Sequence, residues 1–127
     1  MSSATGKRYD WKILALGRGV GTATKAEEYL KSLGYKNITV YGNVENSKDG
    51  DETIITLLQQ TDWDAVSFGG GLTGYDDHFP REITTLHWFN RLVNLVHQYV
   101  PKAKLIFVHS PNSIVDGIHR VLDEHHE

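Results

Sequence analysis

The chain has 127 residues, 39% of them hydrophobic and 23% charged, and a formal net charge of −3. This length and composition are typical of one globular domain, and the negative charge provides no basic field to attract nucleic acid or an anionic membrane. Because the sequence has no cysteine, it excludes a disulfide framework, a thiolate metal site and a cysteine nucleophile.

The polar N-terminus predicts a flexible tail over residues 1–10, followed by a single domain over residues 11–127. The tail lacks the apolar core of a secretion signal, and no apolar run in the chain is long enough to span a membrane. We therefore expect a cytoplasmic protein with no membrane partner and no nucleic-acid partner.

Four short apolar runs alternate with segments of helical periodicity. The runs predict strands at residues 12–16, 38–41, 65–68 and 104–108. Apolar residues at helical spacing predict helices at residues 22–33, 51–60, 81–100 and 113 to about 124. In the longest helix, the spacing predicts an inward-facing stripe of Leu86, Phe89, Val93, Val96 and Val100.

These elements predict an α/β fold. Strands that are apolar throughout are typical of a parallel sheet covered by helices on both faces. Right-handed crossovers then favour a three-layer αβα sandwich, with a four-stranded parallel sheet in the flavodoxin-like, or Rossmann-like, order 2-1-3-4.

The predicted strand order locates a ligand site. In open α/β sheets, ligands bind beyond the carboxyl ends of the strands where the order reverses, which here lies between the first and third strands. The loops that leave those strands are glycine-rich, at residues 17–24 and 69–77, and hold seven of the chain's 12 glycines. Glycine lets backbone N–H groups turn toward a ligand, and the start of a helix favours an anion.

We therefore expect a small ligand, with an anion such as phosphate as one candidate. Arg18, Thr22 and Thr24 would add donors in the first loop, and Tyr75 lies in the second. The residues predicted to bind the ligand come from these loops and from the exit of the fourth strand: Gly17, Arg18, Gly19, Gly21, Thr22, Thr24, Gly69, Gly70, Gly71, Thr73, Tyr75, His109 and Asn112.

A structural role for the same residues stays open. Tight turns use glycine, Thr22 or Thr24 could cap a helix, and the glycines at 17, 19 and 21 do not match a dinucleotide fingerprint. His109 could act as an acid or base, or could lie in a polar loop where Asn112 or Ser113 caps the last helix. The run from Asp76 to His78 could hold a hard cation or form a solvated loop, and we expect no metal.

The second half of the chain resembles a family of small uncharacterised α/β proteins known mainly from bacteria. The similar segments are DAVSFGGGL at residues 64–72, FNRLVNLVH at residues 89–97 and PKAK at residues 101–104, followed by Pro111 and Asp116. This resemblance covers about half the chain. It implies the same flavodoxin-like fold and no particular reaction.

Two enzyme families are also similar in part. Asp116-Gly117-Ile118-His119 resembles the D-x-x-H motif of SGNH-type hydrolases, which implies a triad Asp and His, but Gly17-Arg18-Gly19 replaces the block that holds their nucleophilic serine. The loop from Gly19 to Lys25 resembles the phosphate loop of flavodoxins without its Thr-Gly-Asn-Thr core. In that resemblance Tyr75 would stack on a flavin.

Three classes of function therefore remain. The leading expectation is a small-molecule binding module, without a resident cofactor. The alternatives are an SGNH-like or flavin-dependent enzyme, and a protein-interaction module that uses the exposed side of the helix at residues 81–100 around Trp88. The sequence leaves open whether the protein is an enzyme, which ligand it takes and whether it forms a homo-oligomer.

Overall fold

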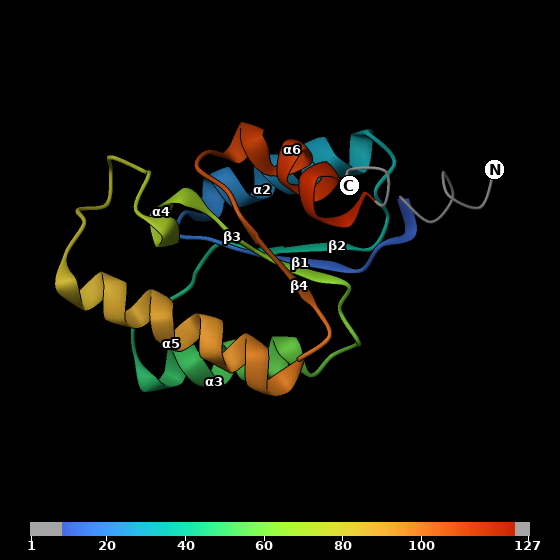
Figure 1. Cartoon of the computed structure of the whole chain (residues 1–127). Helices are drawn as coiled ribbons and strands as arrows, with labels where there is room; N and C mark the ends of the chain where they lie inside the picture. The colour runs from blue at the N-terminus through green and yellow to red at the C-terminus, as the bar shows by residue number, and fades with distance from the viewer. Residues whose placement is uncertain (1–8, 124–127) are drawn as a thin grey trace.

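Figure 1 shows the computed structural model of the chain, in which residues 9–123 are described. One sheet of four strands lies between two layers of helices. Residues 1–8 of the predicted tail lie outside the described residues. At the end of that tail, the Tyr9 ring packs edge-on against the Tyr35 ring, with 5.1 Å between their centroids.

Each strand forms from one of the apolar runs. They are β1 (Ile13–Leu16), β2 (Ile38–Tyr41), β3 (Ala65–Phe68) and β4 (Lys104–Phe107). The sheet order is β2-β1-β3-β4, and every neighbouring pair is parallel. The structure thus confirms the predicted fold class, a three-layer α/β sandwich with the flavodoxin-like order 2-1-3-4. It also confirms that β1 and β3 are neighbours, the relation on which the predicted ligand site depends.

Two helices cover each face of the sheet (Figure 1). On one face they are α2 (Val20–Ser32) and α6 (Ile114–Leu122), and on the other α3 (Lys48–Leu58) and α5 (Ile83–Tyr99). The sequence does not predict two short elements, α4 (Gly70–Thr73) and the 3₁₀ turn η1 (Pro111–Ser113). Neither is long enough to show the periodicity that marks a helix.

Large side chains fill the face of the sheet beneath α3 and α5. The buried residues from the two central strands and from α5 are Leu14, Leu16, Val66, Phe68, Trp88, Leu92 and Val96. Ring contacts extend this layer toward the edge of the sheet, where Phe68 lies edge-on to Phe89 and to Phe107. This face is therefore a closed hydrophobic core.

The predicted inward stripe of α5 is confirmed except at its first residue. Val96 is buried, and Phe89, Val93 and Val100 pack against the core while partly buried, whereas Leu86 is 63% exposed. The fully buried residues of the helix are Trp88, Leu92 and Val96, because burying the large Trp88 ring removes more apolar surface from water than burying a leucine. Trp88 is only 2% exposed, so it cannot belong to the predicted interaction surface, and a surface elsewhere on the exposed side of α5 stays a prediction.

On the opposite face, each helix lies closely against an outer strand. A Cβ on Gly42, which follows β2, would come within 2.4 Å of the Ala23 Cβ in α2, so glycine is required for this approach. A Cβ on Gly117 of α6 would lie 2.6 Å from Ile106 Cγ2 in β4. The two helices are therefore held over β2 and β4, with the central strands β1 and β3 between them.

Candidate functional site

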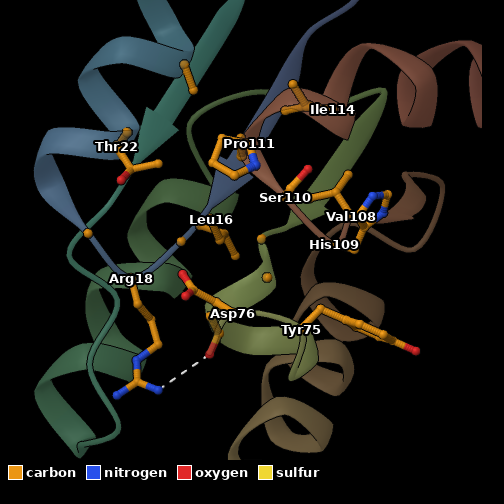
Figure 2. Close-up of a pocket in the computed structure, with 18 of the residues that line it drawn as sticks. Leu16, Arg18, Thr22, Tyr75, Asp76, Val108, His109, Ser110, Pro111 and Ile114 are labelled. Carbon is orange, nitrogen blue, oxygen red and sulfur yellow. Dashed lines mark hydrogen bonds between the residues drawn. The ribbon is translucent and has the colours of Figure 1, made fainter. Parts of the chain in front are cut away.

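A pocket of about 430 Å³ opens over the carboxyl ends of β1 and β3, with α2 on one side and η1 and the start of α6 on the other (Figure 2). Both glycine-rich loops line it. Its position is the reversal point of the strand order, where the sequence predicts a ligand site.

Small side chains on the central strands form the floor of the pocket. The strand register places Val40, Ala15, Ser67 and Ile106 in one row across β2, β1, β3 and β4. Ala15 and Ser67 occupy the two central places of that row, and Ala23 and Ala26 of α2 also line the pocket. The pocket therefore exists because short side chains stand where a filled core would have large ones.

Ser67 is the one polar residue that is buried among residues 9–123, with only 1% of its surface exposed. It lines the pocket, and its hydroxyl makes no hydrogen bond within the described part of the chain. Within residues 9–123, the one fully buried side-chain nitrogen or oxygen without a partner is Trp88 Nε1, so the Ser67 hydroxyl reaches the surface of the pocket rather than lying sealed in the core. The floor of the pocket thus carries a single polar group that a ligand could satisfy.

The first glycine-rich loop is fixed by backbone hydrogen bonds to the end of β2, and no described side chain caps the N-terminus of α2 beside the pocket. Gly17 and Gly19 donate their N–H groups to the carbonyls of Tyr41 and Gly42, at 2.9 and 2.7 Å. Gly19 has a φ of 147°, which a side chain rarely permits. Neither threonine caps α2: no side chain does so, and Thr24 Oγ1 donates to the Val20 carbonyl instead.

Arg18 lines the pocket, but its guanidinium packs against α5 and the segment before it. The Arg18 Cζ lies 4.1 Å from the centroid of the Phe79 ring and 5.1 Å from that of Trp88. Nη1 donates to the Gly71 carbonyl over 3.4 Å, the dashed line in Figure 2. The side chain also passes close to Gly71, where a Cβ would lie 3.1 Å from Arg18 Cβ. Arg18 therefore joins the two glycine-rich loops to each other and to α5.

The second glycine-rich loop turns through α4 back to the mouth of the pocket. The Gly70 carbonyl accepts the N–H groups of Gly74, Tyr75 and Asp76, which reverses the chain. A Cβ on Gly70 would lie 2.9 Å from the His109 carbonyl, so the loop after β4 passes directly beside this glycine. The reversal brings Tyr75 and Asp76 to the pocket.

Asp76 lies in the second predicted loop, and the structure brings it to the lining of the pocket. Its Oδ1 accepts the backbone N–H of His78 at 2.9 Å and lies 3.0 Å from His78 Nδ1. These two hydrogen bonds hold the pKa of Asp76 below its ordinary value of 3.8, with a smaller contribution from the positive charge of Arg18. Asp76 is therefore a carboxylate at neutral pH.

The loop after β4 forms the far wall of the pocket. Ser113 Oγ accepts the N–H groups of His109 and Ser110, both at 3.2 Å, and donates to the Ser110 carbonyl. Ser113 thus stabilises the loop and η1, whereas the side chain of Asn112 caps neither η1 nor α6. His109 is exposed at the mouth.

Nine of the residues predicted to bind a ligand line this pocket: Gly17, Arg18, Gly19, Thr22, Gly69, Gly70, Gly71, Tyr75 and His109. Four others do not line it. Gly21 and Thr24 lie exposed on α2, Asn112 is exposed in η1, and Thr73 Oγ1 donates to the Val108 carbonyl at 3.0 Å. For all thirteen residues, inside or outside the lining, ligand binding itself stays a prediction.

Sequence reasoning missed the floor and walls of the pocket, and it placed Asp76 and Asp77 in the second loop without naming them as ligand-binding residues. The floor could have been found from the short residues Ala15 and Ser67 near the ends of two apolar strands. Asp76, Asp77 and His78 also line the pocket. Within residues 9–123, no group of three or more His, Asp or Glu side chains is arranged to hold a metal ion.

No protein-family model matches the sequence, and no curated protein matches it either. The fold is therefore established by the structure, and the family resemblances of the second half of the chain stay predictions. No helix in residues 9–123 is long and apolar enough to cross a membrane.

Proposed function

We propose that the protein binds a small organic molecule in the pocket between α2 and η1. The observation that carries this proposal is Ser67, whose hydroxyl makes no hydrogen bond within residues 9–123 and lies on the floor of a mainly apolar pocket. A volume of about 430 Å³ is typical of small-molecule sites, which combine apolar walls with a few polar groups.

The lining suggests the shape of the ligand. An apolar body would lie over Ala15 and Val40, between Ala26 of α2 and Ile114 of α6. A polar atom at its inner end would bond Ser67. Further polar groups would remain at the mouth, where the glycine-rich loops and Asp76 lie. Removing such a body from water contributes about 25 cal/mol per Å² of apolar surface buried.

The hydrolase alternative is less well supported. The triad that it implies needs Asp116 and His119 near a nucleophile, but neither residue lines the pocket. His119 Nδ1 lies 3.7 Å from Asp123 Oδ2, one turn further along the chain. A binding role uses the residues that the pocket holds, so we prefer it. We also propose that the protein acts in the cytoplasm and belongs with the small flavodoxin-like α/β proteins that its second half resembles.

A thermal-shift and NMR experiment tests the binding role. The ligand panel is inorganic phosphate, AMP, FMN and the indole compounds tryptamine, tryptophol and indole-3-acetate. We expect at least one compound to shift the backbone signals of residues 17–22 and 69–76. Ser67→Leu, which fills the floor of the pocket, should abolish that shift. Thr56→Leu, at an exposed position of α3, should leave it unchanged.

Two outcomes would contradict the proposal. One is that no compound in the panel binds the wild-type protein. The other is that binding survives unchanged in Ser67→Leu, which would place the ligand elsewhere on the molecule.

A further inference from the structure

The charges at the mouth of the pocket restrict which ligand it can take. Two carboxylates line the mouth, those of Asp76 and Asp77. Arg18 is the one lysine or arginine in the lining, and its guanidinium already lies against Phe79 and Trp88. A polyanionic ligand would meet two like charges, offset only by the guanidinium of Arg18, which is engaged with Phe79 and Trp88.

Asp76 has an open hydrogen-bonding position. Both of its contacts with His78 use Oδ1, and Oδ2 has no partner within residues 9–123. Figure 2 shows the carboxylate directed into the pocket, and the side chain is 35% exposed. A carboxylate oxygen accepts hydrogen bonds only, so its natural partner is a donor, and a charged donor binds it more strongly than a neutral one.

We propose that the ligand is a small primary amine with an apolar body, whose ammonium group bonds Asp76 Oδ2 while the body lies over Ala15 and Ser67. This inference rests on the proposed binding function and adds the charge of the ligand. It replaces the phosphate candidate that the glycine-rich loops indicate on their own.

Three probes with the same indole body separate the charge classes. Tryptamine carries an ammonium group, tryptophol a hydroxyl and indole-3-acetate a carboxylate. We expect tryptamine to bind wild-type protein about tenfold more tightly than tryptophol, the low end for a charge-assisted hydrogen bond, because Asp76 is partly exposed. Indole-3-acetate should bind more weakly than tryptophol. Calorimetry or NMR titration at low ionic strength measures all three affinities.

Asp76→Asn tests the assigned partner. The asparagine keeps a side-chain oxygen that accepts the His78 N–H, so the loop should retain its conformation. The variant should bind tryptamine about as weakly as tryptophol, and tryptophol affinity should not change, which shows that the pocket is intact. The matched control is Asp116→Asn, which removes an exposed carboxylate of α6 outside the lining and should leave the tryptamine preference unchanged.

The outcomes distinguish the two proposals. Equal affinity of the wild-type protein for all three probes would overturn the amine inference and leave the pocket proposal standing. Tighter binding of indole-3-acetate would overturn it in favour of an anion. A tryptamine preference that survives Asp76→Asn would overturn the role of Asp76. If none of the probes binds but phosphate, AMP or FMN does, the amine inference fails alone. Both proposals fail when no compound binds.

Discussion

Leu14 and Ala15 are neighbours in β1, yet one lies in a filled core and the other on the floor of a pocket. Leu14 faces the layer of α3 and α5, in one buried cluster with Trp88 and Leu92. Ala15 faces the gap between α2 and α6, each of which is held on an outer strand. The comparison teaches that the size of inward side chains, on one common sheet, decides which face is closed and which can receive a ligand.

The largest expected effect comes from changing the size of these two side chains of β1, a smaller residue at Leu14 and a larger one at Ala15. Leu14→Ala should lower the free energy of unfolding by about 2–5 kcal/mol, because it leaves a cavity in a filled core. Ala15→Val should change it by less than the roughly 1–3 kcal/mol that overpacking a filled core costs, since the added methyl groups enter open space. Urea denaturation measures both. A large loss for Ala15→Val would show that the pocket face is as tightly packed as the other.

A smaller effect is expected at Arg18, which connects the two faces. Arg18→Ala should reduce the free energy of unfolding by about 1 kcal/mol, because it removes the contact of the guanidinium with two aromatic rings. Lys25→Ala, at an exposed position of α2, is the control and should have little effect. Equal changes in the two variants would mean that the ring contacts of Arg18 do not stabilise the fold.

The smallest effect concerns protonation at the mouth of the pocket. Because the folded state lowers the pKa of Asp76, the carboxylate contributes stability above its ordinary value of 3.8, and that contribution is lost as the pH falls through the folded pKa. Amine binding should weaken over the same acidic range. A titration followed by the NMR signal of the Asp76 carboxyl carbon should therefore have its midpoint below 3.8. A midpoint at or above the ordinary value would contradict the hydrogen bonds from His78.

The fold was predictable because each strand is a short apolar run between polar or glycine-rich segments. Parallel strands buried on both faces lose the alternation that separates one face from the other. For this reason the sequence indicated where β1 and β3 end, but not that Ala15 and Ser67 share one face. The sequence likewise did not show that α5 buries Trp88 and exposes Leu86, since both residues are apolar and only packing selects between them.

Part of the site was predictable and part was not. The glycine-rich loops could be located from strand order alone, because that order fixes where the carboxyl ends of β1 and β3 meet. Asp76 belongs to the second loop, but its position at the mouth could not be predicted, because it depends on the reversal through α4, where three N–H groups converge on the Gly70 carbonyl. Arg18 was identified, but its neighbour Trp88 lies 70 residues away in sequence and could not be foreseen.

The contact of Arg18 with Trp88 has an optical consequence. Arg18 lines the pocket, while its guanidinium lies 5.1 Å from the centroid of the Trp88 ring in the closed core. Indole emission responds to a nearby positive charge, so a ligand that displaces the Arg18 loop should change the fluorescence of Trp88. With Trp11 and Trp63 replaced by phenylalanine, the remaining tryptophan would serve as an intrinsic reporter of pocket occupancy for ligands that do not themselves fluoresce.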